Sequence, residues 1–277
     1  MSTNDDHAAN ADRWVVKAGS SLCLGDIDTR SIEAAPGDKH VTDAACDELI
    51  SSLGEWQNRL WAERRQSLLV VLQAMDAGGK DGTIRNVFTG VNPQGVYVAS
   101  FKAPTDEELR HDFLWRIHHE VPGHGQIGVF NRSHYEDVLI ARVNHLVPEA
   151  VWRHRYGIIR DFESSLVAAN TTIVKLFLHI SAEEQAERLQ ARLDDPTKRW
   201  KFSAADLEVR KRWDDYQVAY EQALAETSTD EAPWYVVPAD RKWYRNWAVL
   251  QILVAAMERI DPQFPPEEPG LVGLVIT

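Results

Sequence analysis

Cysteine is scarce in this sequence, which has only Cys23 and Cys46 among its 277 residues. Neither has another Cys or a His nearby at the spacing of a metal site, so the sequence indicates neither a disulfide framework nor a zinc site. A reducing compartment is therefore expected.

Long hydrophobic runs are missing as well. No apolar stretch approaches the roughly 18 to 20 residues that a membrane-spanning helix needs. The first residues, from Met1 to Arg13, are polar where a signal peptide would carry its apolar core. Cytoplasmic localisation, with no membrane partner, is the resulting expectation.

The sequence also lacks an excess of positive charge. Its 30 Lys and Arg residues stand against 42 Asp and Glu residues, which gives a net charge of −12. Because a protein that wraps a nucleic acid normally presents a basic face, no nucleic-acid partner is expected. A smaller polyanionic substrate would require a local basic lining.

Apolar residues make up 44% of the chain and gather in five short runs separated by helical patterns. The runs are typical of strands buried on both faces of a parallel sheet, and they cover residues 68–72, 96–101, 127–130, 173–180 and 234–237. The helical patterns cover residues 43–60, 83–89, 107–119, 134–145, 149–169, 182–193, 204–226 and 242–259. This alternation predicts an α/β, doubly wound, three-layer fold with a five-stranded parallel sheet. Two helix starts carry the reciprocal capping pattern, Thr105 with Glu108 and Ser181 with Glu184.

A glycine-rich segment follows the first apolar run directly and leads into a helix. In this context, backbone amides and the helix dipole can hold phosphate oxygens, and a lysine adds a mobile charge. The predicted phosphate-binding residues are Ala77, Gly78, Gly79, Lys80, Asp81, Gly82 and Thr83. The alternative is a tight turn whose glycines serve packing alone, but three glycines around one lysine are more than such a turn needs. The segment therefore favours a P-loop kinase-like fold.

This loop departs from the strict Walker A pattern at two positions. Ala74 stands where the first glycine is expected, and Asp81 stands where a Ser or Thr would bind Mg²⁺. Asp76 offers a carboxylate that can take over the metal from the missing hydroxyl. Asp76 is therefore the first candidate metal ligand.

Polar residues also begin abruptly after the apolar run 127–130. Open α/β sheets bind ligands at the carboxyl ends of their strands. Asn131 takes the place of the Asp of a Walker B site and is a weaker metal ligand. Arg132 offers a planar fork of donors to phosphate oxygens, with a surface ion pair as the alternative interpretation.

Several motifs in this order resemble the family-2 polyphosphate kinases over roughly residues 45 to 260. They are residues 76–82 (DAGGKDG), 92–95 (NPQG), 100–102 (SFK), 130–137 (FNRSHYED), 195–201 (DPTKRWK), 213–216 (WDDY) and 232–234 (APW). The resemblance implies reversible phosphoryl transfer from inorganic polyphosphate to AMP or ADP, with Mg²⁺ or Mn²⁺ as the cofactor. It also implies a homo-oligomer, and adenine or other purine nucleotides as the second substrate.

Gln73 and Asn131 stand where many relatives carry Glu and Asp. Together with Glu136, they are similar to the class that accepts both AMP and ADP. The resemblance places Asn131, Glu136 and Asp137 at the nucleotide, and it keeps Asp76 and Asn131 as the metal ligands.

Residues 182–216 are predicted to form a helical lid with a basic lining. Between Arg192 and Arg212, seven basic residues stand against four acidic ones. Helix, turn and helix is how small-molecule kinases build a lid that closes over substrate. A solvated face is the alternative for any single charge, and the resemblance selects Arg192, Lys198 and Lys201 as phosphate contacts.

Asp161 and Glu163 lie on the predicted helix 149–169 near the nucleotide end. Asp161 is a candidate to orient an acceptor phosphate, although two such carboxylates more often form a solvated helix edge.

Phosphoryl transfer needs positioning and charge neutralisation more than covalent help from the protein. The expected catalytic residues are therefore Asp76, Lys80, Arg132 and Arg192. Two other functions stay open, an ATP-dependent nucleoside-monophosphate kinase on the same fold and a non-catalytic nucleotide-binding regulatory module. The expected organisation is an N-terminal arm (1–42), a catalytic domain (43–261) and a C-terminal tail (262–277).

Overall fold

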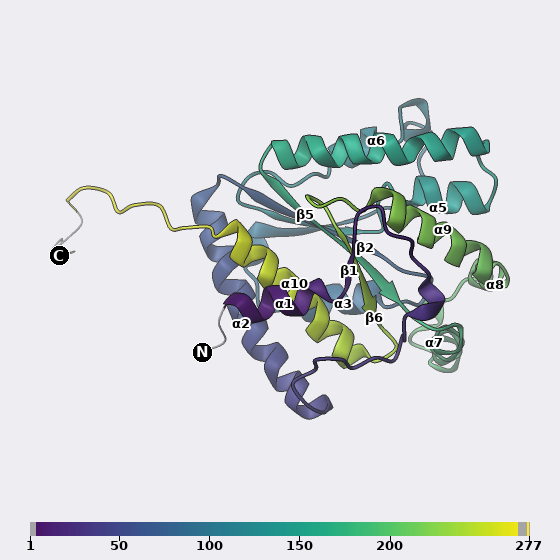
Figure 1. The fold of residues 1–277 in the computed structure, drawn as a ribbon, viewed down its shortest axis with the longest axis horizontal. Coiled ribbons are helices and arrows are strands. Elements are labelled where there is room, and N and C mark those ends of the chain that lie inside the picture. The colour runs from purple at the N-terminus through teal and green to yellow at the C-terminus, as the bar shows by residue number, and fades with distance from the viewer. Residues whose placement is uncertain (1–3, 271–275, 277) are drawn as a thin grey trace.

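The structure is a computed structural model that describes residues 4–270 and residue 276. Its centre is one sheet of six strands in the order β1-β6-β5-β2-β4-β3 (Figure 1). The strands are β1 (Val15–Val16), β2 (Ser67–Gln73), β3 (Val96–Ser100), β4 (Ile127–Asn131), β5 (Thr171–His179) and β6 (Trp234–Pro238). All neighbouring strands are parallel except β1 and β6.

The prediction of five strands was wrong by one. The additional strand, β1, pairs antiparallel with the edge of β6 and comes from the N-terminal arm. Two residues are too few for a strand period to be visible in the sequence. The other five strands correspond to the five apolar runs, and every residue of β2 is buried, as expected for a central strand with helices on both faces.

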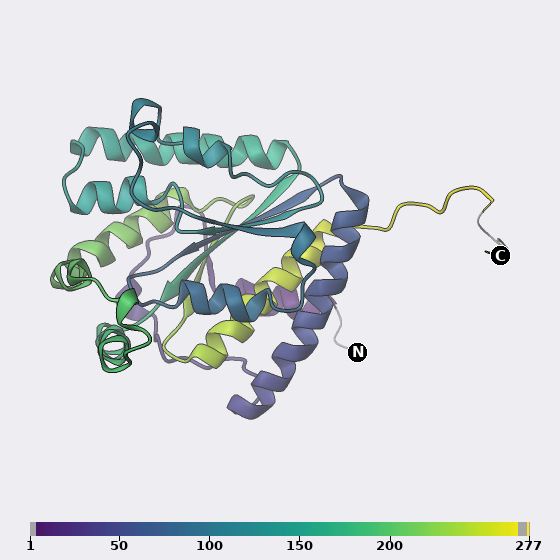
Figure 2. The ribbon, with the colours of Figure 1, turned by 180° about the vertical axis from the view of Figure 1, so that it is seen from behind.

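Helices cover both faces of the sheet, so the three predicted layers are present (Figures 1 and 2). On one face lie α1 (Asn4–Asp12), α2 (Lys39–Glu63), α3 (Lys80–Val87) and α10 (Lys242–Ile260). On the other lie α4 (Trp115–His118), α5 (Glu136–Val143), α6 (Glu149–Ala168) and α9 (Trp213–Thr227). Alternate residues of β5 enter the two cores, with Leu176 in the first and Phe177 in the second. The helices α7 (Ala182–Asp194) and α8 (Ala204–Lys211) lie beside the carboxyl ends of the parallel strands.

The single helix predicted over residues 107–119 was wrong. A 3₁₀ turn at Glu108–Arg110 and the four-residue helix α4 take its place. The side chain of Asp112 accepts a hydrogen bond from the amide of Leu114 at 3.0 Å, and such local bonds compete with a continuous helix.

The capping predictions had different outcomes. Thr105 and Glu108 bond reciprocally, at 2.7 Å to the amide of Thr105 and at 3.3 Å to the amide of Glu108. Ser181 caps α7 by accepting from the amide of Glu184 at 3.0 Å. Glu184 does not complete the pair, because Asp240 accepts from the amide of Ser181 instead.

The helix predicted over residues 204–226 is two helices, α8 and α9, which break at Arg212. The guanidinium group of Arg212 donates to the carbonyl of Val143 and to the side chain of Asn144 at the end of α5. The break therefore lies where the predicted lid region meets the second helical layer.

The two terminal segments lie differently. The arm packs against the body, because α1 contacts α10 and Thr29 donates to Asp240 at 2.8 Å. The tail runs from Asp261 to Gly270 without helix or strand and extends away from the body (Figure 1), and its residues 271–275 and 277 lie outside the described residues. Within the described part of the chain, no helix is both long and apolar enough to cross a membrane.

Candidate active site

The glycine-rich segment between β2 and α3 turns through two left-handed residues. The φ angle is 61° at Ala77 and 103° at Gly79, which is the N-cap of α3. A Cβ atom on Gly79 would lie 2.2 Å from Nη1 of Arg245. The backbone angle therefore favours glycine at this position, and a side chain here would also displace the end of Arg245.

Free backbone donors gather at the start of α3. Among the described residues, the amides of Gly79, Lys80, Asp81 and Gly82 donate to no protein acceptor, as the first turn of a helix allows. Neighbouring free amides at the positive end of a helix dipole form an anion site. The predicted phosphate loop therefore has the donors that its role requires.

The ammonium group of Lys80 lies within this loop. Its Nζ donates to the carbonyl of Ala74 at 2.9 Å. Burial and the neighbouring Arg132 lower the pKa of Lys80, while nearby carboxylates, Asp76 first among them, act in the opposite direction. A partly desolvated cation beside free amides is suited to a phosphate oxygen.

Arg132 joins the loop from the adjacent strand β4. The register of β2 and β4 pairs Leu72 with Asn131, so the segments that follow both strands meet at one edge of the sheet. Arg132 has a φ of 64°, and its Nη2 lies 3.2 Å from Oδ1 of Asp76. The first two predicted regions are therefore in contact.

Two carboxylates flank the loop. Asp76 pairs with Arg132, and Asp81 accepts a hydrogen bond from Nδ2 of Asn131 at 2.9 Å. Burial acts to raise the pKa of Asp81, but the Asn131 hydrogen bond and the charges of Lys201 and Lys80 hold it below its usual value.

This donor set fits a magnesium ion that is shared with a substrate. Within the described residues, no group of three or more His, Cys, Asp or Glu side chains forms a metal cage made by protein alone. Mg²⁺ is usually held by one or two carboxylates together with water and phosphate oxygens. Asp76 supplies such a carboxylate, whereas the amide nitrogen of Asn131 already faces Asp81.

The lid region reaches the loop through Lys201, whose Nζ lies 3.6 Å from Oδ2 of Asp81. Arg192 donates to the carbonyl of Lys201 at 3.3 Å and lies 3.7 Å from Asp206 of α8. Burial, followed by the charge of Asp76, raises the pKa of Asp206, so α8 also faces the loop. The three predicted regions therefore converge in the folded chain.

Three predicted residues do not join this convergence. Lys198 pairs with Asp195 at 2.6 Å within the lid turn. Asp137 pairs with Arg155 at 3.3 Å. Asp161 is exposed on α6, and its side chain makes no hydrogen bond or ion pair among the described residues.

Glu136, the first residue of α5, does lie beside the cations. Burial raises its pKa, while the charges of Arg132 and Lys80 lower it. On α9, burial raises the pKa of Tyr216 and of Tyr220, and the charge of Glu136 raises both further. The charge of Glu136 therefore acts both on the loop cations and on the tyrosines of α9.

Sequence reasoning missed two buried arginines behind the loop. Arg188 of α7 donates to the carbonyls of Ala77 and Gly78 at 3.2 and 3.1 Å. Arg245 of α10 is 2% exposed. Burial, and to a lesser extent the positive charge of Arg188, lowers the pKa of Arg245 to about 10. Arg188 was detectable in principle because it lies one helical turn before Arg192 on the same face, whereas nothing local to Arg245 indicated a site.

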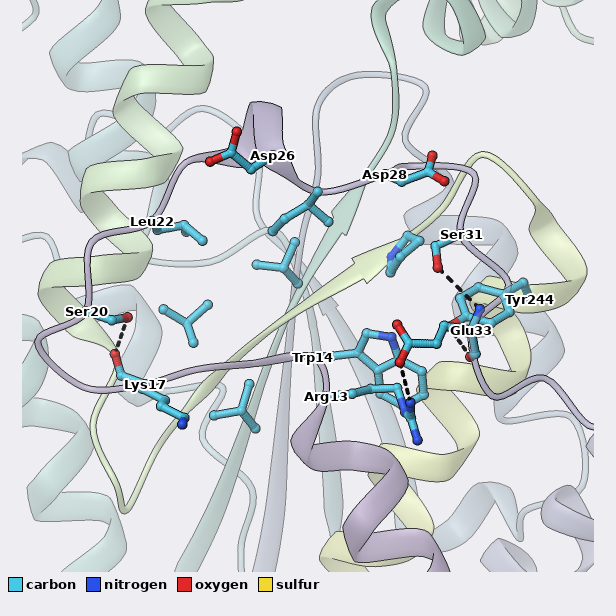
Figure 3. A pocket seen from close by; sticks show the side chains of 15 residues that line it. Arg13, Trp14, Lys17, Ser20, Leu22, Asp26, Asp28, Ser31, Glu33 and Tyr244 are labelled. Atoms are coloured by element: carbon cyan, nitrogen blue, oxygen red, sulfur yellow. Dashed lines mark hydrogen bonds and ion pairs between the residues drawn. The ribbon is translucent and has the colours of Figure 1, made fainter.

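A cavity of about 500 Å³ lies elsewhere, between the N-terminal arm and the end of β6 (Figure 3). Trp14 and Tyr244 line it together with arm residues such as Leu22 and Asp28. None of the predicted site residues borders this cavity.

Comparisons with known proteins connect the geometry to characterised sequences. The sequence profile of a family described as Polyphosphate kinase 2 matches residues 37–265. An AMP/ADP-polyphosphate phosphotransferase from Meiothermus ruber is 55% identical over 264 residues, which cover 95% of this chain and 99% of the relative. An ADP-polyphosphate phosphotransferase from Rhodopseudomonas palustris is 50% identical over 233 residues, which cover 80% and 81% of the two chains.

A solved structure has the same architecture. The crystal structure of polyphosphate kinase 2 from Arthrobacter aurescens is 46% identical to this chain, with a TM-score of 0.91. The alignment covers 95% of this chain and 94% of that one. The sequence and the fold therefore agree on one family over nearly the whole length.

Proposed function

This chain belongs to the polyphosphate kinase 2 family, and on that premise we propose that it transfers phosphoryl groups between inorganic polyphosphate and AMP or ADP. It is a phosphotransferase, and relatives at 50% and 55% identity are named for these substrates. The observation that carries the proposal to this chain's own residues is that Lys80, Arg132 and Lys201 contact three residues of the glycine-rich segment, Ala74, Asp76 and Asp81. Such a local cluster of cations suits a chain of phosphates even though the net charge of the chain is −12.

The terminal phosphate of polyphosphate binds at the loop in this proposal. The residues that hold it are Ala77, Gly78, Gly79, Lys80, Asp81, Gly82 and Thr83, with Lys198 and Lys201 along the lid. Lys80, Arg132 and Arg192 neutralise the charge that spreads over the transferring group, and an acceptor phosphate attacks in line. We expect no phosphoenzyme, because positioning and charge neutralisation suffice for this chemistry.

Asp76 is the residue that we assign to Mg²⁺, with Asn131 as a second ligand. When bound, the ion supplies positive charge to phosphate oxygens. The contact between Arg132 and Asp76 at 3.2 Å keeps that carboxylate oriented toward the loop.

The nucleotide binds on the side of Glu136 in this proposal, with Asn131, Asp137 and Asp161 as further contacts. Glu136 is the best supported of these, because it already faces Arg132 and Lys80. Asp137 and Asp161 become contacts only if a nucleotide or a lid movement brings them toward the loop. Assembly into a homo-oligomer and cytoplasmic localisation stay predictions from the sequence.

The proposal is tested by incubating the purified protein with polyphosphate, Mg²⁺ and AMP in the absence of ATP, and by following ADP and ATP by chromatography. We expect both products. Lys80→Ala and Arg132→Ala should each lower the rate by on the order of 10² to 10⁵ while the protein stays folded. Arg110→Ala is the matched control, since that side chain is 77% exposed and pairs only with Glu107 of its own turn among the described residues, and it should keep the wild-type rate.

Three outcomes would contradict the proposal. Turnover of AMP that requires ATP would indicate a nucleoside-monophosphate kinase. Stoichiometric nucleotide binding without turnover would indicate a regulatory module. Wild-type rates in both Lys80→Ala and Arg132→Ala would remove these two residues from the reaction.

A further inference from the structure

The backbone carbonyl groups of residues 74–79, in the turn between β2 and α3, all accept hydrogen bonds from protein donors. Lys80 Nζ donates to Ala74, the amide of Gly78 donates to Met75, and Gln185 Nε2 donates to Asp76. Arg188 Nη1 donates to Ala77 and Gly78, and the amide and hydroxyl of Thr83 donate to Gly79. The amides at the start of α3, by contrast, are free. The loop is therefore polarised, with its carbonyls bound to protein and its donors available to an anion.

Arg188 holds two of these carbonyls and does more than line the loop. Its Nη2 donates to the carbonyls of Ala239 and Asp240 at 2.6 and 3.1 Å, and its Nε donates to Glu184 at 2.7 Å. The side chain is only 9% exposed. One guanidinium group thus ties the loop to the segment that follows β6, with all three of its nitrogens in use.

The carbonyl of Gly78 controls the free amide of Gly79 through the geometry of the peptide bond, while the carbonyl of Ala77 shares its peptide with the amide of Gly78, which donates to Met75. In a trans peptide the C=O and N–H groups point in opposite directions. When Arg188 binds the carbonyl of Gly78, the amide of Gly79 must face away from Arg188. Ala77, with a φ of 61°, is a strained neighbour, so an unheld peptide group here has reason to rotate.

Lysine cannot replace this arrangement. Arginine presents its donors in a planar fork, while an ammonium group is a compact point charge. The four carbonyls lie on two chain segments that only a forked donor can reach at once. Gln185, one turn earlier on α7, holds the carbonyl of Asp76 at 2.9 Å and leaves the next two carbonyls to Arg188.

We propose that Arg188 is a positioning residue for phosphoryl transfer: by holding the carbonyls of Ala77 and Gly78, it fixes the turn before α3 and keeps the free amide of Gly79 directed at the terminal phosphate of polyphosphate. This inference rests on the proposed function. Arg188 touches no reacting atom, and its effect reaches the substrate through the loop.

The test compares Arg188→Met and Arg188→Lys with the wild type and with the exposed control Arg110→Met. Steady-state rates are measured against polyphosphate at saturating AMP, and against AMP at saturating polyphosphate. We expect kcat/KM for polyphosphate to fall by on the order of 10²-fold in Arg188→Met, as for a misplaced reacting group, with KM for AMP unchanged. The kcat/KM of Arg188→Lys for polyphosphate should lie between those of Arg188→Met and the wild type. In a third variant, Arg188→Ala, added guanidinium ion should restore part of the lost rate.

The outcomes separate the two proposals. A wild-type protein that makes no ADP from polyphosphate and AMP refutes the proposed function, whatever Arg188 does. If the wild type is active and the rate of Arg188→Met lies within about threefold of the wild-type rate, the positioning role is overturned. Equal falls in kcat/KM for polyphosphate and for AMP, together with a lowered Tm, show general structural damage and also overturn the positioning role. Should Arg188→Met not fold, Arg188→Lys decides by the same split between the two substrates.

Discussion

Gly79 carries two constraints in a single residue. Its φ of 103° is open to glycine, and Arg245 approaches to within 2.2 Å of where a Cβ would be. Gly157, a half-buried residue within α6, meets neither constraint, because an added Cβ there finds its nearest neighbour, Nη2 of Arg160, at 3.9 Å. The pair allows the same substitution to be compared in two settings.

We expect Gly79→Ala to disable the loop. The left-handed backbone costs about 1–2 kcal/mol for an alanine, and the end of Arg245 must move, so we expect the turn that carries the free amides to change its conformation. Polyphosphate-dependent ADP formation should fall by on the order of 10²-fold. Gly157→Ala should keep full activity and gain about 0.5–1 kcal/mol in the free energy of unfolding. Full activity in Gly79→Ala would show that the loop geometry does not control the rate.

Glu136 shows how one residue can serve the site at a cost to stability. Burial raises its pKa above the ordinary value of 4.5 even though Arg132 and Lys80 act in the opposite direction. A carboxyl whose pKa is higher in the folded state binds its proton more tightly there. Its ionised form therefore destabilises the folded protein above the unfolded pKa, and this cost disappears as the pH falls below about 4.5.

Glu136→Gln should accordingly raise the Tm at pH 7 and lower the rate of phosphoryl transfer. The gain in Tm should shrink as the pH is lowered toward 4.5, since the wild-type carboxyl then becomes neutral as well. Thermal unfolding of both proteins between pH 4 and pH 8 measures the difference. A Tm gain that grows toward acid pH has the wrong sign for this account.

At the scale of elements, α6 and β5 are joined by a buried ion pair beneath the site. Nζ of Lys175 lies 2.6 Å from Glu163, and Glu163 also accepts from the hydroxyl of Tyr135 at 2.7 Å. Lys175 faces the same core as Trp234, whose ring centroid lies 5.4 Å from Nζ. The network holds Tyr135, three residues after Arg132, and so supports the segment that carries that arginine.

Removing one member of this pair should be costly. Lys175→Met leaves the carboxylate of Glu163 buried without its partner, and we expect a loss of about 3–5 kcal/mol in the free energy of unfolding. The double variant Lys175→Met/Glu163→Gln should recover much of this loss, because no unpaired charge remains. Lys39→Met is the control, since Lys39 and Asp43 form an exposed pair worth at most about 1 kcal/mol. Urea unfolding provides all three values, and equal losses in the two lysine variants would contradict the account.

The elements differ in how far their sequence determines them. The apolar run around Val70 identified β2 because a strand buried on both faces needs no partner to be recognised. The loop from Ala77 to Thr83 was also predictable, because strand, glycines, lysine and helix are adjacent in the chain. The role of Arg188 on α7 was harder to predict, since only the folded structure shows that its side chain contacts backbone carbonyls and not solvent. Arg245 lies 166 residues after Gly79 in the numbering, and no local pattern connects them.

At the scale of the whole molecule, charge is distributed unevenly. The chain carries a net charge of −12, yet Lys80, Arg132, Lys201 and the two buried arginines Arg188 and Arg245 surround the loop. Several of these cations pair with site carboxylates, Arg132 with Asp76 and Lys201 with Asp81. A bound polyanion would compete with those carboxylates, and its affinity depends on the local cations and not on the negative remainder.

Polyphosphate affinity should therefore fall steeply with ionic strength despite the acidic chain. Neutralising phosphates on a single-stranded polyanion changes log K by about 0.7 per phosphate for each decade of salt. Three contacts, from Lys80, Arg132 and Lys201, thus give a slope of about −2. Calorimetric titration of polyphosphate between 50 and 500 mM KCl, chosen as roughly a decade of salt, measures the slope, and Lys201→Ala should make it shallower by about 0.7. AMP offers a single phosphate, so its binding should depend on salt far less. A polyphosphate slope near zero would mean that the substrate is held without these cations, and the loop would then not be its binding site.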